Sequence, residues 1–536
     1  MDRYDAVIVG AGAAGLSAAT CAASLGARVL LLDRSDGSSS DFAKSGGGPA
    51  AAGTSFQAGV GVVDSPSHWM EDIKRKTGNS VEDTIVHLVT TRARDAIHFQ
   101  ARQLGMDIHL VANIPVAGHS VARLYGTPNE IGREYAEMLA AAAAGIPNIV
   151  RMNDTEVSGL MVADGAVTGV RARTRDKEQE FSAPFTVLAC GGFAANRTML
   201  RTFIPEIAEA LHIGCPHNDG CGILWGQSLG AATSFLDSYQ GHGHVTADGK
   251  GRLGLGLTTL GAIMVDRQGR RFVREDIGPS ELAAHVLAAP GGTAFEIYDQ
   301  SIHDRAFSMG AYREAVARGV AVTAPTPQKL ATLLDVPTDA FLATFEAANR
   351  AAKGEIPDPL NREAYARPLT SPLWGVRIIG ALAHTQGGML VNSHAQVIRT
   401  NGKPIAGLLA AGGTVTGISG HGAAGYSSGN GLAQAFALGM IAAETITGKE
   451  RFFAGDWRHN ENQAATDSRV ARSHPGTTRK CIGAGFSQPA GSLHSALCGR
   501  RNRRHHCSPP RQQDFKHVGT PAGRRQPDGR RRNQRD

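Results

Sequence analysis

The sequence lacks the cysteine patterns of metal-binding and disulfide-rich proteins. Its 536 residues include seven cysteines, and no two of them have Cys-x-x-Cys spacing. Neither a zinc site nor a disulfide framework is therefore predicted, and no metal site is expected. Haem-attachment and iron–sulfur spacings are also missing, so we expect any electron donor or acceptor to be a separate molecule.

Long apolar runs are missing as well. No stretch reaches the roughly 18 uncharged apolar residues of a membrane-spanning helix. The first apolar run begins at Ala6, close to Met1, which leaves no room for a signal peptide. We expect a cytoplasmic protein without a membrane span.

An excess of positive charge is missing outside the C-terminal end. The formal net charge is +7, but residues 451–536 alone hold 18 Lys and Arg against 6 Asp and Glu, so the rest is mildly acidic. One interpretation is a basic arm for nucleic acid, and another is a disordered extension. The mixture of Arg, His, Pro, Gln and Cys also resembles out-of-frame translation. We expect 450–536 to be a disordered tail and expect no nucleic-acid partner.

The most informative segment that is present spans residues 5–33. Ala6–Val9 has the length and β-branched content of a buried parallel strand. Gly10, Gly12 and Gly15 then permit a tight turn, the approach of a pyrophosphate and close packing of the next helix. The N-terminus of that helix offers free N–H groups to phosphates. Asp33 ends a second apolar run, where a carboxylate can accept a ribose hydroxyl, so the segment predicts adenine dinucleotide binding.

Further glycine-rich segments follow in a fixed order. Segment 41–65 contains Lys44-Ser45-Gly46-Gly47-Gly48, whose small residues could lie flat against a planar ring. From this segment alone a flexible loop is equally compatible. Later, 185–193 and 407–413 each read as a buried strand that ends in a Gly-Gly turn, and a glycine-rich stretch at 420–431 precedes an apolar helix. The start of that helix is a second place where N–H groups could meet an electron-rich carbonyl.

Taken in order, these motifs resemble the flavoprotein family of fumarate reductase and succinate dehydrogenase. The same superfamily includes ketosteroid dehydrogenases, urocanate reductase and tricarballylate dehydrogenase. The resemblance covers about residues 4–448 and also includes Asp219-Gly220, Gly269–Val273 and His384–Gly388. It implies bound FAD, with the ADP half on the first unit and the isoalloxazine ring beneath a mobile cap. The chemistry it implies is hydride exchange between flavin N5 and an activated carbon–carbon bond.

The resemblance also implies an α/β fold with two domains. Residues 1–235 and 371–449 are expected to form a Rossmann-like FAD-binding domain with a β-meander around 150–185. Residues 236–370 are expected to form an inserted α+β capping domain. The residues expected to contact FAD are Gly10, Gly12, Ala13, Ala14, Gly15, Asp33, Arg34, Ser45, Gly46, Gly47, Gly48, Ala189, Gly191, Gly192, Asp219, Gly412, Gly413, Ser427, Ser428, Gly429 and Asn430.

The chain departs from the family at three positions that bear on its chemistry. Members with covalent flavin have a histidine in the loop that here spans 43–52, and this loop has none, so we expect non-covalent FAD. Fumarate-type enzymes hold a substrate carboxylate with an arginine where this chain reads Ala423–Tyr426. Their proton-donating arginine is replaced here by Pro279. Because arginine binds carboxylates through a rigid fork, the loss of both argues against fumarate or succinate as substrate.

Four side chains are the candidates for catalysis. His242 and His384 match substrate-facing histidines of the family, and each could hydrogen-bond a carbonyl. Tyr426 occupies the place of a tyrosine beside the flavin in ketosteroid dehydrogenases, although an ordinary buried tyrosine is as compatible with its sequence. Arg274 could move a proton, or it could form an ion pair at the edge of the cap. His244 and His421 are expected to be structural.

The sequence therefore predicts an FAD-dependent dehydrogenase or reductase that acts on CH–CH groups next to a carbonyl. An enone or an unsaturated acid fits the missing arginines better than a dicarboxylate does. Two alternatives stay open at this point. One is a flavin-dependent oxidase or hydroxylase, and the other is a catalytically silent FAD-binding protein.

Overall fold

The computed structural model describes residues 3–112, 115–174, 177–254 and 256–449. The predicted tail, 450–536, lies outside the described residues, so the prediction for it stays untested. Within the described part of the chain, no helix is long and apolar enough to cross a membrane.

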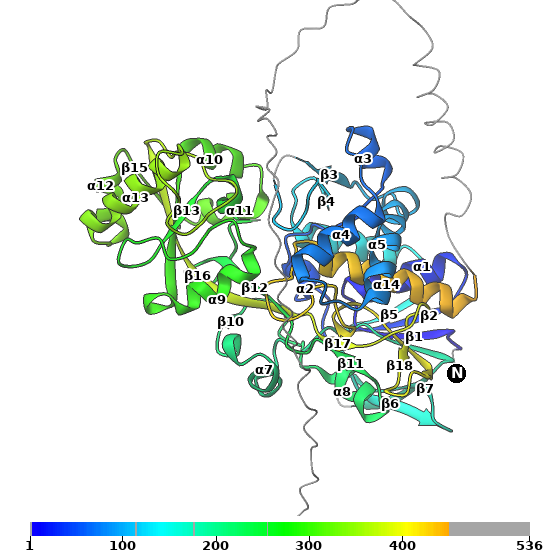
Figure 1. Ribbon diagram of the computed structural model, residues 1–536. Helices are drawn as coiled ribbons and strands as arrows, with labels where there is room; N and C mark the ends of the chain where they lie inside the picture. The colour runs from blue at the N-terminus through cyan, green and yellow to red at the C-terminus, as the bar shows by residue number, and fades with distance from the viewer. Residues whose placement is uncertain (1–2, 113–114, 175–176, 255, 450–536) are drawn as a thin grey trace, which may run out of the picture. The chain divides into compact units, whose positions relative to one another are not determined.

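The two strands of the N-terminal fingerprint belong to a six-stranded sheet (Figure 1). Its strands, in spatial order, are β18 (Gln396–Ile398), β19 (Pro404–Ala410), β9 (Phe185–Leu188), β1 (Ala6–Val9), β2 (Val29–Leu32) and β5 (Ile149–Met152). Strand β1 is parallel to both neighbours, with Ala6 opposite Val29 on one side and Phe185 on the other. All four residues of β1 are buried, as the apolar run predicts for a central parallel strand.

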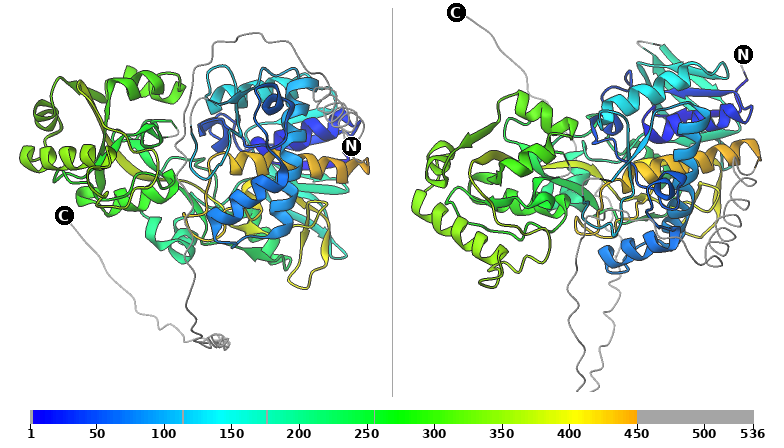
Figure 2. Two further views of the ribbon diagram at one scale, coloured as in Figure 1. Left: turned by 45° about the horizontal axis from the view of Figure 1, so that its top comes forward. Right: turned by 90° about the horizontal axis from the view of Figure 1, so that it is seen from above.

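Helices α1 (Ala13–Ser24) and α14 (Asn430–Thr447) pack against each other beside this sheet (Figure 2). Their backbones approach closely at Gly439, where an added Cβ would lie 2.6 Å from the carbonyl oxygen of Ala14. The other helices before the meander are α2 (Asp41–Lys44), α3 (Ser55–Gly59), α4 (Pro66–Thr77), α5 (Asp83–His98) and α6 (Gly132–Ala144). Residues 419 positions apart are joined here, since the Ser17 hydroxyl donates to the carbonyl of Phe436.

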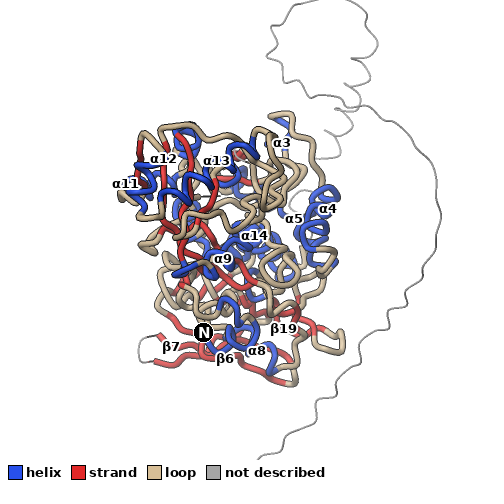
Figure 3. Tube along the Cα trace, turned by 60° about the vertical axis from the view of Figure 1, so that its left-hand side comes forward, coloured by secondary structure: helices blue, strands red, loops and turns tan. Residues whose placement is uncertain are grey.

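An antiparallel three-stranded sheet matches the β-meander expected around 150–185. It consists of β6 (Thr155–Ala163), β7 (Ala166–Thr174) and β8 (Lys177–Ser182). Its strand β7 contacts β19 and β9 of the parallel sheet, and Figure 3 shows β6, β7 and β19 together.

A second sheet is assembled around the long strand β16 (Leu373–Thr385). Its other strands are β10 (Leu211–His212), β12 (Tyr239–Thr246), β13 (Ile263–Val265), β14 (Thr293–Asp299) and β15 (Ala321–Ala324). The helices among them are α9 (Pro279–Ala288), α10 (Gln300–Ala306), α11 (Gly310–Ala317), α12 (Pro327–Leu334) and α13 (Thr338–Ala352). This region has its own buried apolar cluster. The expected cap boundary at residue 370 falls just before β16, so the second sheet includes residues beyond 236–370.

Several further strands and α-helices are short. They are β3 (His109–Val111), β4 (Leu124–Gly126), α7 (Arg197–Phe203), α8 (Cys221–Ser228), β11 (Thr233–Ser234) and β17 (Gly388–Met389). Strand β16 ends at Thr385, from which the chain returns through β17 toward β18 and β19. A side chain near residue 384 thus lies where the second sheet gives way to the first.

Candidate active site

One cavity of about 720 Å³ collects most of the residues that the sequence singles out. It is lined by the fingerprint after β1, the loop 40–48, the turn after β9, strand β12 and the start of α14. Of the predicted cofactor residues, those that line it are Gly10, Gly12, Ala13, Ala14, Asp33, Arg34, Ser45, Gly46, Gly47, Gly48, Ala189, Gly191, Gly192, Gly412, Gly413, Ser428 and Gly429. Those that do not are Gly15, Asp219, Ser427 and Asn430.

The fingerprint glycines are required by close contacts. Gly10 has a φ of +102°, and a Cβ there would lie 2.5 Å from the carbonyl oxygen of Ala189 on the neighbouring strand. At Gly15 a Cβ would lie 1.8 Å from the carbonyl oxygen of Gly10, so this glycine serves packing rather than the cavity. Gly12 precedes α1 without a side-chain cap, which leaves the first N–H groups of the helix available to an anion.

Asp33 holds the turn of the fingerprint as well as lining the cavity. Its Oδ2 accepts the N–H of Ala11 at 2.6 Å, and its Oδ1 accepts the N–H of Ser35 at 2.8 Å. A carboxylate has about four acceptor positions, so capacity remains for a ribose hydroxyl. The next residue, Arg34, donates to Asp219 at 2.9 Å, which explains why Asp219 supports the cavity wall without lining it.

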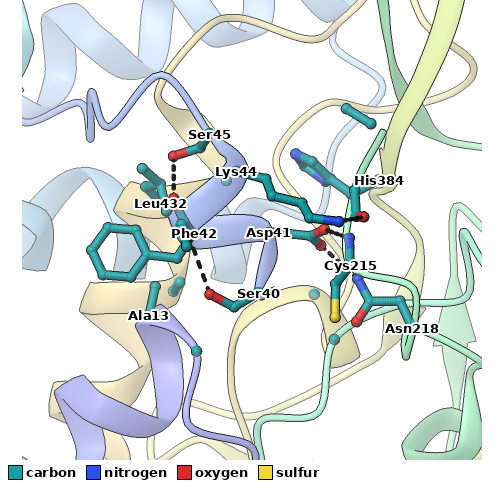
Figure 4. Close-up of a pocket in the computed structure, with 18 of the residues that line it drawn as sticks. Ala13, Ser40, Asp41, Phe42, Lys44, Ser45, Cys215, Asn218, His384 and Leu432 are labelled. Atoms are coloured by element: carbon teal, nitrogen blue, oxygen red, sulfur yellow. Dashed lines mark hydrogen bonds between the residues drawn. The ribbon is translucent and has the colours of Figure 1, made fainter. Parts of the chain in front are cut away.

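The loop between β2 and α3 is fixed to segment 214–218 (Figure 4). Oδ1 of Asp41 accepts the N–H of Cys215, and its Oδ2 accepts Nδ2 of Asn218, both at 2.6 Å. Nζ of Lys44 donates to the carbonyl of Gly214 at 2.8 Å. At Gly46 an added Cβ would find no atom within 4 Å, so this part of the loop presents bare backbone to the cavity. Such a surface can accept a flat ring.

The start of α14 contains polar atoms without partners. Gly429 caps the helix without a side chain and has a φ of +87°. Beside it, the side-chain amide nitrogen and oxygen of Asn430 and the hydroxyl of Ser427 are buried and make no hydrogen bond within the described residues. Neither Ser427 nor Asn430 lines the cavity; the residues of this helix start that do are Ser428, Gly429 and Gly431. This helix start and the start of α1 both face the cavity, which fits a dinucleotide with a pyrophosphate at one and a ring carbonyl at the other.

His242 lies on β12 and is held neutral by its surroundings. Burial lowers the pKa of its imidazole well below the ordinary value. The backbone N–H of His244 donates to Nδ1 of His242 at 3.3 Å, so the proton of the neutral ring resides on Nε2. His242 therefore presents a neutral N–H donor, and β12 places the residue in the cavity wall. His244 instead pairs with buried Glu296 at 2.6 Å, consistent with the structural role expected for it.

His384 is oriented by Gln386 near the end of β16. The hydroxyl of Ser419 donates to Oε1 of Gln386 at 3.0 Å, and Nε2 of Gln386 lies 2.9 Å from Nδ1 of His384. Nδ1 of His384 also lies 3.2 Å from the carbonyl oxygen of Thr385, so Gln386 and Thr385 together fix the orientation of the ring. Burial lowers the pKa of His384, so it is neutral at pH 7.

Tyr426 lies next to His384, with their ring centroids 6.0 Å apart and nearly perpendicular. Its side chain is 5% exposed and lines the cavity. Burial raises the pKa of the phenol, so the hydroxyl stays protonated and can donate a hydrogen bond. The structure thus brings His242, His384 and Tyr426 to one cavity.

Arg274 is not part of this group. It donates to both oxygens of Asp276 at 2.7 and 2.8 Å and pairs with Glu363 at 3.2 Å, away from the cavity lining. The structure therefore favours the ion pair over the proton route that the sequence left open, because this guanidinium is already engaged. We do not carry Arg274 forward as a catalytic candidate. His421 likewise forms an exposed pair with Asp237.

Comparison with known proteins decides the family. The sequence model for the FAD binding domain matches residues 5–432, more than half of the chain. The chain belongs to this FAD-binding family. FAD is therefore the cofactor of this protein.

Three relatives of this flavoprotein illustrate the resemblance. An NADH:fumarate oxidoreductase of Klebsiella pneumoniae is 28% identical over 84% of this chain, and the chain spans about half (48%) of that protein's length. A flavocytochrome c3 fumarate reductase in its open conformation superposes with a TM-score of 0.70 at 25% identity, covering 83% of this chain and 78% of that one. A 3-ketosteroid dehydrogenase from Rhodococcus jostii RHA1 gives 0.65 at 23% identity, covering 84% and 97%. The expected family and the α/β FAD-binding fold are confirmed.

Sequence reasoning missed several residues of this cavity. Asp41 and Asn218 fix the loop beside the cofactor site, yet neither belongs to a motif that could have identified it. Arg252 lies in a short Gly-rich turn that reads as ordinary loop, and only its placement after β12 brings it to the cavity. Gln386 lies within a motif that was recognised, but its role of orienting His384 depends on Ser419 from another segment.

Proposed function

We propose that this flavoprotein adds or removes hydrogens across a carbon–carbon bond next to an activating carbonyl. When bound, FAD supplies N5 as the atom that gives or takes the hydride. The substrate is an enone or an unsaturated acid, or the saturated counterpart of either. The observation that carries the proposal is the convergence of His242, His384 and Tyr426 on the cavity that also holds the dinucleotide fingerprint.

These three side chains suit the polarisation of a carbonyl. Each is neutral near pH 7 and carries one N–H or O–H, since burial lowers the pKa of both histidines and raises that of the tyrosine. Neutral donors held in place by the protein stabilise the negative charge that develops on a carbonyl oxygen when the adjacent carbon–carbon bond is attacked. Tyr426 is in addition our candidate for moving the proton, which needs a group whose proton is exchangeable.

Different parts of FAD would be bound by different segments of the chain. Gly10, Gly12, Ala13 and Ala14 would hold the pyrophosphate at the start of α1, and Asp33 the ribose. The bare backbone of 45–48 and the start of α14 at 427–430 would face the ring system. With no histidine in the loop 43–52, FAD is bound without a covalent link. The proposal includes an FAD-binding domain formed by 1–235 and 371–449 and a capping domain formed by 236–370. It also includes a cytoplasmic location and a separate electron partner.

The test begins with the absorption spectrum of the purified protein before and after acid precipitation. Flavin released into the supernatant supports non-covalent FAD, and flavin retained in the pellet contradicts it. Enones and unsaturated acids are then screened with wild type, Tyr426→Phe and His384→Ala. The assignment fails if both variants keep wild-type turnover. Rapid oxygen consumption without an organic acceptor would favour an oxidase or hydroxylase instead, and a protein that stays colourless with added FAD would favour the silent alternative.

A further inference from the structure

Among the positively charged side chains of the cavity wall, Arg252 is the one that is partly buried and has no partner among the described residues. Arg34 is paired with Asp219 at 2.9 Å, and Lys44 donates to a backbone carbonyl at 2.8 Å. The exposed Arg133 lies 3.5 Å from Glu314, and Lys250 is exposed to solvent. Arg252 lines the cavity and is partly buried, and within the described residues its guanidinium makes no ion pair or hydrogen bond.

The position of Arg252 is fixed by backbone bonds of the hairpin that follows β12. The N–H of Leu253 donates to the carbonyl of His244 at 3.0 Å, and that of Thr246 donates to Gly251 at 2.9 Å. These bonds place Arg252 opposite Val245, which also lines the cavity. A break in register between His242 and Val245 lets both residues of β12 reach this wall. The hairpin therefore places Arg252 in the same cavity wall as His242.

The charge of Arg252 acts on all three candidate catalytic side chains. It contributes to lowering the pKa of His242 and of His384, after burial, and it opposes the rise in the pKa of Tyr426. All four side chains line the same cavity. Burial also lowers the pKa of Arg252 itself. A guanidinium that is removed from water and lacks an anion is unfavourable, and an anionic ligand would relieve this.

We propose that Arg252 binds a carboxylate of the substrate. This inference rests on the proposed function and narrows it, because it selects an unsaturated or saturated carboxylic acid over a neutral enone. The planar fork of arginine can hold both carboxylate oxygens, with His242, His384 and Tyr426 close by. A single unpaired guanidinium in the described lining matches a single carboxylate group. It also offers a substitute, from a different segment, for the arginines missing at 423–426 and 279.

The experiment compares acids with amides of nearly the same shape. Holoenzyme is titrated with crotonate and crotonamide and with cinnamate and cinnamamide, and binding is followed by the change in flavin absorption and by the melting temperature. We expect wild type to bind at least one acid about tenfold or more tightly than its amide, since a charged bidentate pair is involved. Arg252→Met should abolish this preference, and Arg252→Lys should keep part of it. Arg201→Met, which removes the same charge at an exposed site outside the cavity lining, should change the preference by less than about twofold.

Flavin content separates this role from a role in holding the cofactor. FAD released per chain should be equal in wild type and Arg252→Met. The inference is overturned if the Met variant loses FAD, if its acid preference is unchanged, or if wild type binds neither acid better than its amide. Wild-type turnover of a neutral enone with a kcat/KM at least as high as that of any acid would also overturn it while leaving the proposed function in place. Acid binding that depends on Arg252 without turnover of any CH–CH or C=C compound would instead refute the proposed function and keep the anion site.

Discussion

Nε2 of His119 lies 2.9 Å from the carbonyl oxygen of Ser428, a residue 309 positions later in the chain. The contact joins the segment before β4 to the turn that leads into α14. Nδ1 of the same ring lies 3.5 Å from Nη1 of Arg123, which is buried with Asp64 and Asp72. His119 therefore connects a buried ion-pair network to Ser428, which lines the cavity. The parts of this network can be tested separately.

His119 should make the protein less stable in mild acid. Burial lowers the pKa of His119 to about 4, below its usual 6.5. Between these two pKa values the unfolded chain binds a proton on His119 that the folded chain excludes. The stability that the neutral ring contributes is therefore fully present above pH 6.5 and is lost as the pH falls toward 4. The loss is at most about 1.4 kcal/mol per pH unit. Urea unfolding between pH 7.5 and 4.5 should show a shallower pH dependence for His119→Gln than for wild type, and equal slopes would contradict this.

Arg123 should be among the most sensitive positions for stability. Its side chain is fully buried, donates to both oxygens of Asp64 at 2.7 and 2.9 Å, and contacts Asp72. Arg123→Met removes the buried cation that Asp64 and Asp72 share and leaves Asp72 with Arg75 alone, and we expect a loss of about 3–5 kcal/mol in the free energy of unfolding. Arg201→Met is the matched control, because Arg201 and Glu209 form an exposed pair worth below about 1 kcal/mol. Similar denaturation midpoints for the two variants would count against the network.

Gly46→Ala should affect FAD binding without affecting the fold. No protein atom lies within 4 Å of a Cβ added at Gly46, so the melting temperature of the apoprotein should not change. If the flavin ring lies on this backbone, the methyl group would hold it away and the FAD dissociation constant should rise about tenfold or more, equivalent to about 1.4 kcal/mol. Gly59→Ala is the control, since it is equally open but lies outside the cavity lining. Equal FAD affinity in both variants would place the ring elsewhere.

Tyr426→Phe should lower turnover with little loss of substrate binding. The variant keeps the ring that packs against His384 and removes the hydroxyl. If this hydroxyl donates to charge that develops during the reaction, kcat should fall about 10²-fold or more while KM changes little. The melting temperature and flavin content serve as controls for folding. An unchanged kcat would show that another group acts on the carbonyl oxygen.

The sequence by itself determined the cofactor and the fold that carries it. The fingerprint at residues 5–33 specifies a local strand–turn–helix unit, and such units are set by glycines and apolar runs that lie close together in the chain. For the same reason the strand at 185–188 and the helix after 430 were predicted near their observed bounds. The ordered motifs then identified the family.

Only the tertiary structure decided how the remaining side chains are used. Arg274 and Arg252 look alike in the sequence, but Asp276 and Glu363 engage the first, while the hairpin after β12 carries the second to the cavity. The orientation of His384 follows from Ser419 acting through Gln386, and the neutral state of His242 follows from burial. Such roles depend on partners tens or hundreds of residues away, and on removal from water, because the energy of a charge or proton is set by its three-dimensional surroundings rather than by its neighbours in the chain.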